Sequence, residues 1–204
     1  MKKRGFALTL ALVLLLLTGC SGGGAQQSGK TSVRVVLALP YVADGAEDAL
    51  EKSIADALPE LNTADAKLNV TAVSTGDPEK DPYGTMAGVA QMGGMFSSKE
   101  VEVLICKSDD ARRYGDNGEA YIPLSQLFTD AELAEMGVSG TGVGMTDENG
   151  NPTGETSVPC GIDLSGCKAL EKLVTAKDLG VYVVQGTPNV ENAKAVIRHL
   201  AGLK

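Results

Sequence analysis

Residues 33–39 of this chain read VRVVLAL, a run of β-branched and aliphatic side chains that stops at Pro40. A run this apolar is typical of a strand buried on both faces of a parallel sheet. Two similar runs follow, and segments with helical spacing lie between them: strands at 68–75 and 101–106, helices at 44–61 and 83–98. This alternation implies right-handed crossovers. We therefore expect an α/β fold with a largely parallel sheet, layered as a three-layer α/β/α sandwich.

Finer expectations concern the helix ends and the second half of the chain. Asp44, with Glu47 three residues later, is expected to cap the first helix. Residues 147–155, DENGNPTGE, are dense in turn formers and predict the tip of a hairpin within 129–157. A further strand is expected at 179–185, and a last helix after Asn189. In the second helix, one stripe is expected to face the core: Met86, Val89, Ala90, Gly93 and Phe96.

Composition limits the function classes. The chain has 204 residues, of which 43% are hydrophobic and 22% charged, with one His and no Trp. So large an apolar fraction excludes a disordered chain. A net charge of −8 argues against a nucleic-acid binder, because neutralising phosphates needs clustered Lys and Arg. A single His leaves little room for imidazole chemistry.

The amino terminus indicates export. Lys2, Lys3 and Arg4 precede an apolar stretch at 6–17, which is too short to span a bilayer and is typical of a secretory signal. The next residues, Leu17-Thr18-Gly19-Cys20, resemble a bacterial lipobox, in which the Cys thiol is lipidated and the preceding residues are removed. We therefore predict a signal peptide at 1–19 and a membrane anchor of acyl chains such as palmitate at Cys20. An ordinary secretory signal is the alternative.

A tether and a single domain are expected after the signal. Removal of residues 1–19 takes away three positive charges and no negative one, so the mature chain would carry −11. An acidic surface disfavours anionic lipid, which leaves attachment to the lipid on Cys20. Residues 20–32 are rich in Gly, Ser and Gln and would span about 20 Å as a flexible linker. Residues 33–204 form the predicted α/β domain.

Three cysteines remain in that domain. Cys160 and Cys167 are seven residues apart and could close a small loop, as cysteines outside the cytoplasm often do. We expect a Cys160–Cys167 disulfide. Cys106 ends an apolar strand, so we expect a buried, inert thiol there, because no His lies near it in sequence to activate it.

Four motifs in order resemble the type 2 periplasmic-binding-protein class of extracellular solute-binding lipoproteins. They are Glu100–Cys106 (EVEVLIC), Tyr121–Leu124 (YIPL), Gly161–Asp163 (GID) and Gly180–Leu200 with its "ENA" helix. The resemblance spans roughly residues 33–128 and 158–202. In that family, two α/β lobes close over a ligand, and the second lobe is inserted between the matching segments. Only Thr129–Ser157 separates them here, which implies one binding-protein-like lobe with a small hairpin in place of the other.

Candidate ligand-binding residues follow the strands, because open α/β sheets bind ligands at the carboxyl ends of their strands. Tyr41 could stack or donate a hydrogen bond, Ser108 could donate, and Asp77 and Asp109 could receive a cationic group. The alternative is structural: Asp77 and Ser108 cap the following helices, and Tyr41 covers the sheet edge.

Metal and catalytic motifs are weak throughout. Asp147, Asn149 and Asn151 match the first spacings of a calcium loop, but Pro152 replaces its Gly and Val158 its bidentate Glu. His199 is expected at an exposed helix end rather than as a general base. No catalytic, metal or cofactor site is therefore predicted.

The sequence supports three functional hypotheses. The first is a non-enzymatic, lipid-anchored extracytoplasmic protein that resembles solute-binding proteins and faces outward from the cell membrane. The second is a structural or interaction module that binds an envelope protein. The third is a carboxylate-dependent hydrolase, whose two distant carboxyl groups would show no fixed spacing in the sequence.

Overall fold

The computed structural model describes residues 31–202, except 166, 168–169 and 171–177. The chain divides into two units after Lys30, and the described residues belong to the second. The predicted signal peptide, Cys20 and all but the last two residues of the tether lie outside the described residues. Within them, no helix is both long enough and apolar enough to cross a bilayer.

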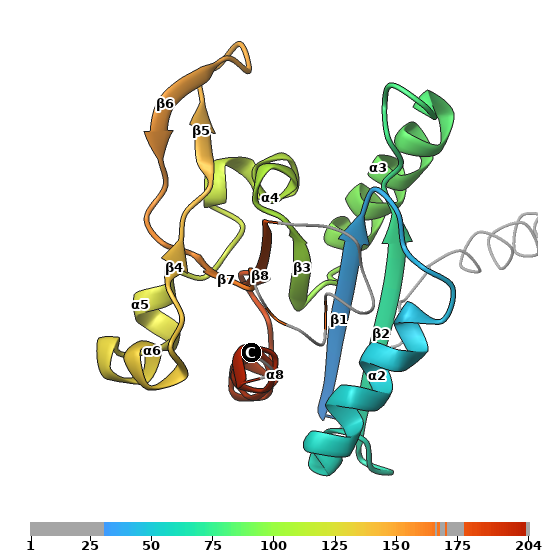
Figure 1. The fold of residues 1–204 in the computed structure, drawn as a ribbon, viewed down its shortest axis with the longest axis vertical. Coiled ribbons are helices and arrows are strands. Elements are labelled where there is room, and N and C mark those ends of the chain that lie inside the picture. The colour runs from blue at the N-terminus through green and yellow to red at the C-terminus, as the bar shows by residue number, and fades with distance from the viewer. Residues whose placement is uncertain (1–30, 166, 168–169, 171–177, 203–204) are drawn as a thin grey trace, which may run out of the picture. The chain divides into compact units, whose positions relative to one another are not determined.

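A six-stranded mixed sheet forms the centre of the domain (Figure 1). Strands β2, β1 and β3 pair in parallel, whereas β8, β7 and β4 are added by antiparallel pairing. Four of the six strands therefore point in one direction. In the order in which they pair, the strands are β2 (Ala66–Ser74), β1 (Thr31–Leu39), β3 (Val103–Lys107), β8 (Leu179–Val183), β7 (Gly161–Asp163) and β4 (Gly140–Thr141). The predicted α/β class is confirmed, and continuous parallel pairing is confined to β2–β1–β3.

Strand β1 carries apolar side chains on both faces of the sheet, and helices cover each of these faces. Val35, Leu37 and Leu39 belong to one hydrophobic cluster, together with residues of α2 (Ala46–Ala57) and α8 (Val190–Gly202). Val36 and Ala38 belong to a second cluster, which includes Met92 of α3 (Pro82–Ser97) and Ala111 of α4 (Ser108–Tyr114). Alternate side chains of a strand point to opposite faces, so these two clusters lie on opposite sides of β1.

The structure corrects the predicted start of α2. Its N-cap is Gly45 in the left-handed conformation, and Asp44 does not cap it. The Glu47 carboxylate instead accepts a hydrogen bond from the Ala72 backbone N–H at 2.8 Å, and Glu51 accepts one from Val70 at 3.4 Å. Because β2 is an edge strand, these two carboxylates of α2 bind N–H groups that would otherwise remain open to another strand.

The predicted core stripe of α3 is wrong for Met86, Ala90 and Gly93, which are exposed, whereas Phe96 does pack against the second cluster. Gly88 and Met92 are its buried residues, whereas Met86 is 71% exposed. Gly88 explains the orientation of the helix, because a Cβ atom added there would lie 2.8 Å from the Thr75 Cα and closer still to the Ser74 carbonyl oxygen. Only a glycine permits this approach of α3 to the end of β2.

Small elements make up the chain from residue 116 to residue 156. The predicted hairpin is present as β5 (Gly144–Thr146) paired with β6 (Pro152–Thr156). Three short helical segments precede it: η2 (Asp116–Gly118), α5 (Leu124–Leu127) and α6 (Asp130–Met136). A further turn, η1 (Pro59–Leu61), follows α2.

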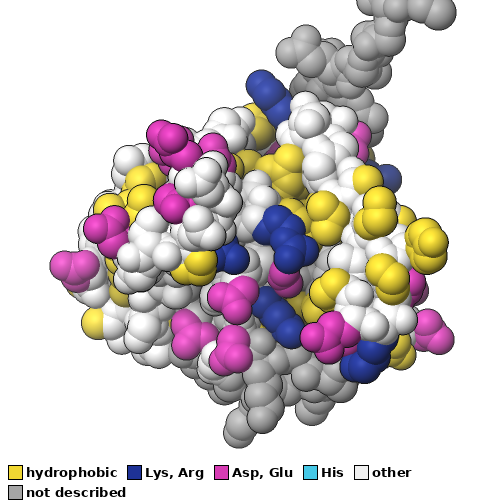
Figure 2. Space-filling model, turned by 90° about the horizontal axis from the view of Figure 1, so that it is seen from above, with side chains coloured by type: hydrophobic (Ala, Val, Ile, Leu, Met, Phe, Trp, Pro, Cys, Tyr) yellow, Lys and Arg dark blue, Asp and Glu magenta, His cyan; other side chains and the backbone are white. Residues whose placement is uncertain are grey.

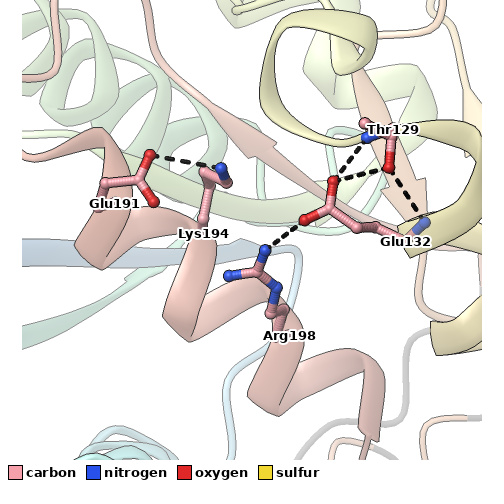
Figure 3. Close-up of polar contacts among 5 residues, drawn as sticks. All are labelled: Thr129, Glu132, Glu191, Lys194 and Arg198. Carbon is pink, nitrogen blue, oxygen red and sulfur yellow. Dashed lines mark hydrogen bonds and ion pairs between the residues drawn. The ribbon is translucent and has the colours of Figure 1, made fainter.

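Helix α6 is joined to α8 by an ion pair (Figure 3). Glu132 and Thr129 form a capping box at the start of α6, and Arg198 of α8 lies 2.6 Å from the Glu132 carboxylate. Lys194 and Arg198 also lie over the Phe128 ring, 5.7 and 5.4 Å from its centroid. The backbone and hydroxyl of Thr129, then Arg198, hold the pKa of Glu132 down to about 2.

Candidate functional site

The predicted site residues follow the carboxyl ends of β1, β2 and β3, which meet at one edge of the sheet because these strands are parallel neighbours. The chain segments leaving this edge are hydrogen-bonded to one another. The Thr75 N–H donates to the Leu39 carbonyl at 2.7 Å, and the Ser74 hydroxyl donates to the Pro40 carbonyl at 3.2 Å. The topology thus brings the segments that carry Tyr41, Asp77, Ser108 and Asp109 to the same edge.

Tyr41 and Asp109 are exposed there. Tyr41 is 66% exposed and Asp109 is also open to solvent. Neither side chain has a hydrogen bond or ion pair with any residue in the described part of the chain. Both are therefore available to an external ligand.

Asp77 and Ser108 make contacts within the protein. Asp77 forms an ion pair with Lys80 at 2.9 Å and accepts a hydrogen bond from the Glu79 N–H at 3.0 Å, and these contacts lower its pKa. The Ser108 hydroxyl lies 3.5 Å from the Asp178 carbonyl. Neither is a helix cap.

Other residues occupy the two cap positions. Asp81 caps α3 by accepting a hydrogen bond from the Gly84 N–H at 2.9 Å. Lys107 occupies the N-cap position of α4 without a side-chain hydrogen bond. The structural alternative for Asp77 and Ser108 was therefore wrong in its mechanism, although both side chains do serve the local fold.

Three tyrosines that were not predicted as site residues lie in or beside α4: Tyr114, Tyr121 and Tyr182. The Tyr121 hydroxyl donates to the Ala111 carbonyl at 2.8 Å, and the Tyr121 and Tyr182 rings lie 4.8 Å apart. The buried hydroxyls of Tyr114 and Tyr182 have no partner at hydrogen-bond distance among the described residues, and the polar side chains near them are those of Thr75 and Ser108 respectively. Burial raises the pKa of Tyr114 to about 12, and raises that of Tyr182 although the nearby Ser108 opposes the rise. Two buried phenols without partners are uncommon in folded proteins, since buried polar atoms are normally satisfied.

Asp110 adds a partly buried carboxylate beside these phenols. Burial raises its pKa, the charges of Arg113 and Lys107 oppose that rise, and Asp109 adds to it. The side chain is neither fully exposed nor fully buried. The edge thus presents carboxylates and cations that can bind a polar ligand, whereas the phenol hydroxyls near them are buried.

The three cysteines of the described part are free and buried. The predicted Cys160–Cys167 disulfide is absent: Cys167 belongs to the cluster with α2 and α8, and Cys160 to the cluster with α3 and α4. The Cys167 thiol lies 3.4 Å from the Leu200 carbonyl, and the Cys160 thiol lies 3.8 Å from the Ser157 hydroxyl. Cys106 is buried as expected, and burial raises its pKa well above the ordinary value.

The calcium-like spacing and the lone histidine have local roles. Asp147 accepts hydrogen bonds from the Asn149 and Asn151 N–H groups at 2.9 and 2.8 Å, which closes the hairpin tip. No group of three or more His, Cys, Asp or Glu side chains is arranged to hold a metal within the described residues. His199 is half-buried rather than fully exposed, with its Nε2 atom 3.2 Å from the Ser53 hydroxyl, and burial lowers its pKa.

A buried carboxyl group lies just before β3, at the opposite end of that strand from the candidate site. Glu102 is 4% exposed, and its Oε2 atom has no partner among the residues described. Burial raises its pKa, and Arg34 opposes the rise. Its alternating position in EVEVLIC gave no signal of this burial, because a strand places Glu102 on the face opposite to Val101 and Val103, which are also buried.

Comparisons with known proteins add no family to this description. No family model matches the chain, and neither a curated protein nor a solved structure matches it.

Proposed function

We propose that this chain is a non-enzymatic lipoprotein, held by the lipid on Cys20 at the outer face of the cell membrane, that binds a small polar solute. The basic start, the apolar stretch and the lipobox-like residues 17–20 support the anchor. Two acyl chains would suffice for stable attachment. The membrane is then a partner only through the lipid.

The proposed fold is a single lobe like those of the type 2 periplasmic-binding-protein class, built as a three-layer α/β/α sandwich. Helices on both faces of the sheet support the layering. The small elements of 129–157, which include α6 and the hairpin, support a lobe without its companion. Such a lobe would bind its ligand on an open edge instead of between two closing halves.

The observation that carries the solute proposal is that Tyr41 and Asp109 are exposed and, among the described residues, unpaired at the carboxyl edge, near the buried hydroxyls of Tyr114 and Tyr182. An open α/β sheet binds ligands at this edge. Asp109, Asp110 and Tyr41 are the side chains beside it that a solute would reach first.

Thermal unfolding of the full chain with amino acids, peptides, sugars and metal salts tests this proposal. A solute at 100 times its dissociation constant should stabilise the domain by about 2.7 kcal/mol, which raises Tm by about 5–10 °C. Tyr41→Ala and Asp109→Asn should reduce that shift, whereas Glu148→Gln at the exposed hairpin tip should preserve it. Absence of a shift with every class would overturn solute binding.

The anchor is tested separately. The wild-type chain, expressed in a bacterium that processes lipoproteins, should incorporate labelled palmitate and sediment with membranes. Cys20→Ala should lose the label. Equal labelling of the two chains would contradict lipidation at Cys20.

The hairpin favours a second candidate function, docking to an envelope protein. All five residues of β6 are exposed, and β5 and β6 form a two-stranded sheet of their own. The free edge of such a ribbon can accept a strand from another protein. Thr153→Pro, which removes a backbone donor from β6, should then abolish membrane pull-down of a partner while the solute-induced Tm shift persists.

A further inference from the structure

Helix α3 carries an uncharged face that no described residue covers. None of its 16 residues is charged, although the chain as a whole carries −8. Gly88 and Met92 face the sheet, whereas Tyr83 is 84% and Met86 71% exposed. In Figure 2, which looks down on the carboxyl ends of β1–β3, hydrophobic side chains gather on the side where α3 lies. At 100° per residue, the centre of the exposed face is Ala90.

Side-chain size changes systematically along this face. Its first half holds the large residues Tyr83 and Met86. Its second half holds only small ones, which are exposed on the same side: Gly93, Gly94 and Ser97. Such a helix fits an antiparallel copy of itself, because large side chains then lie over small ones. A parallel copy would place large against large and leave a gap between the small residues.

Charge at the two ends of α3 has the same complementarity. Before the helix, Asp77 is paired with Lys80, which leaves Glu79 and Asp81 as a negative end. After the helix, Lys99 and Glu100 are exposed, and the Arg34 guanidinium donates to the Lys99 carbonyl at 2.8 Å, so this end carries two cations beside Glu100 and the buried Glu102. Antiparallel helices bring opposite ends together and also oppose their dipoles.

We propose that α3 is a self-association surface that pairs antiparallel with α3 of a second copy of this chain, about a two-fold axis at Ala90. In this register, Met86 lies over Gly94 of the second copy, and Tyr83 lies over Ser97. Asp81 then lies beside Lys99 of the second copy. The proposal rests on α3 and does not depend on the proposed solute site.

The pairing is weak, and that determines the experiment. A helix of 16 residues is about 24 Å long, and one face of it buries less than the roughly 800 Å² per partner of a standard interface. Site-specific disulfide cross-linking detects such contacts directly. Cys106, Cys160 and Cys167 are buried, so the chain without added cysteines gives the background level of cross-linking.

The decisive test places cysteines at Met86 and Gly94 in the full chain. In the proposed register, Met86→Cys and Gly94→Cys, co-expressed and oxidised in cells, should form a disulfide-linked dimer of twice the chain mass. Each variant alone should stay near background, because its two thiols would lie about 12 Å apart along the axis. Ala90→Cys alone should cross-link, whereas Gln91→Cys, exposed about 100° around the helix, should do so much less.

A charged variant provides the second measurement. Ala90→Lys places two ammonium groups face to face at the axis and should lower cross-linking of the Met86→Cys and Gly94→Cys pair about tenfold or more. Lys is a good helix former at an exposed site, so the Tm should be unchanged.

Each remaining outcome would overturn the proposal. Met86→Cys cross-linking with itself would mean a parallel pair. A product of different mass would mean a different partner. Ala90→Cys no more reactive than Gln91→Cys, or cross-linking that Ala90→Lys does not reduce, would mean that α3 does not pair.

Discussion

Gly88→Ala tests the contact that orients α3. The added methyl carbon would lie 2.8 Å from the Thr75 Cα and closer to the Ser74 carbonyl oxygen, both backbone atoms that cannot rotate away. Restoring ordinary contact requires α3 to move by roughly 1 Å, because the Ser74 oxygen is nearer than the Thr75 Cα. Overpacking of this kind costs about 3 kcal/mol when backbone must shift, and the helix propensity of Ala returns about 1 kcal/mol. We therefore expect a net loss of about 2 kcal/mol, equivalent to a Tm about 4–8 °C lower.

Gly93→Ala is the matched control, since nothing lies within 4 Å of a Cβ atom at Gly93 in the same helix. Only the propensity gain remains there, so this variant should be about 0.5–1 kcal/mol more stable than wild type. Urea unfolding of the three proteins, compared at a common m value, measures both changes. If Gly88→Ala stabilises the protein as Gly93→Ala does, α3 does not approach β2 as described, and its exposed face is not the one that carries Ala90.

Three further predictions concern titration and reactivity. Burial raises the folded-state pKa of Glu102 above its ordinary 4.5, so its contribution to stability is present below pH 4.5 and lost as pH rises; Glu102→Gln should therefore raise Tm at pH 7 and leave it unchanged near pH 4. The pKa of Glu132 is lowered to about 2, so its contribution to stability is present above pH 4.5 and is lost as the pH falls from 4.5 to 2. The Tm of wild type should therefore exceed that of Glu132→Gln above pH 4.5, and this difference should vanish by pH 2. Loss of the cap in Thr129→Ala should cost about 1 kcal/mol of stability at pH 7. The buried thiols of Cys106, Cys160 and Cys167 should react with a thiol reagent only in denaturant. Rapid labelling of these thiols in the native protein would contradict their burial.

Most elements could be predicted because their signals are local. The apolar run of β1 and the turn-rich tip of the β5–β6 hairpin each describe their own environment. The inward face of α3 could not be predicted, since an uncharged helix has little periodic contrast. Its orientation depends on one close backbone contact at Gly88, which only the folded chain contains.

The sequence predicted that the candidate residues share one edge of the sheet, but not the contacts that they make there. Tyr41, Asp77, Ser108 and Asp109 do lie on segments that leave one edge, because parallel neighbours end together. Asp77, however, is neutralised by Lys80, and the unpartnered hydroxyls belong to Tyr114 and Tyr182, from α4 and β8. The seven-residue spacing of Cys160 and Cys167 likewise says nothing of the two separate clusters in which these thiols are buried.

Local chemistry was therefore sufficient for the α/β class, the position of the strands and the expectation of an exported, acylated chain. Folding decided which atoms meet. Burial of Tyr182, the orphan oxygen of Glu102 and the outward face of α3 all depend on contacts between segments far apart in the chain. Hydrophobic periodicity records how much of a side chain is removed from water, but not which neighbour removes it.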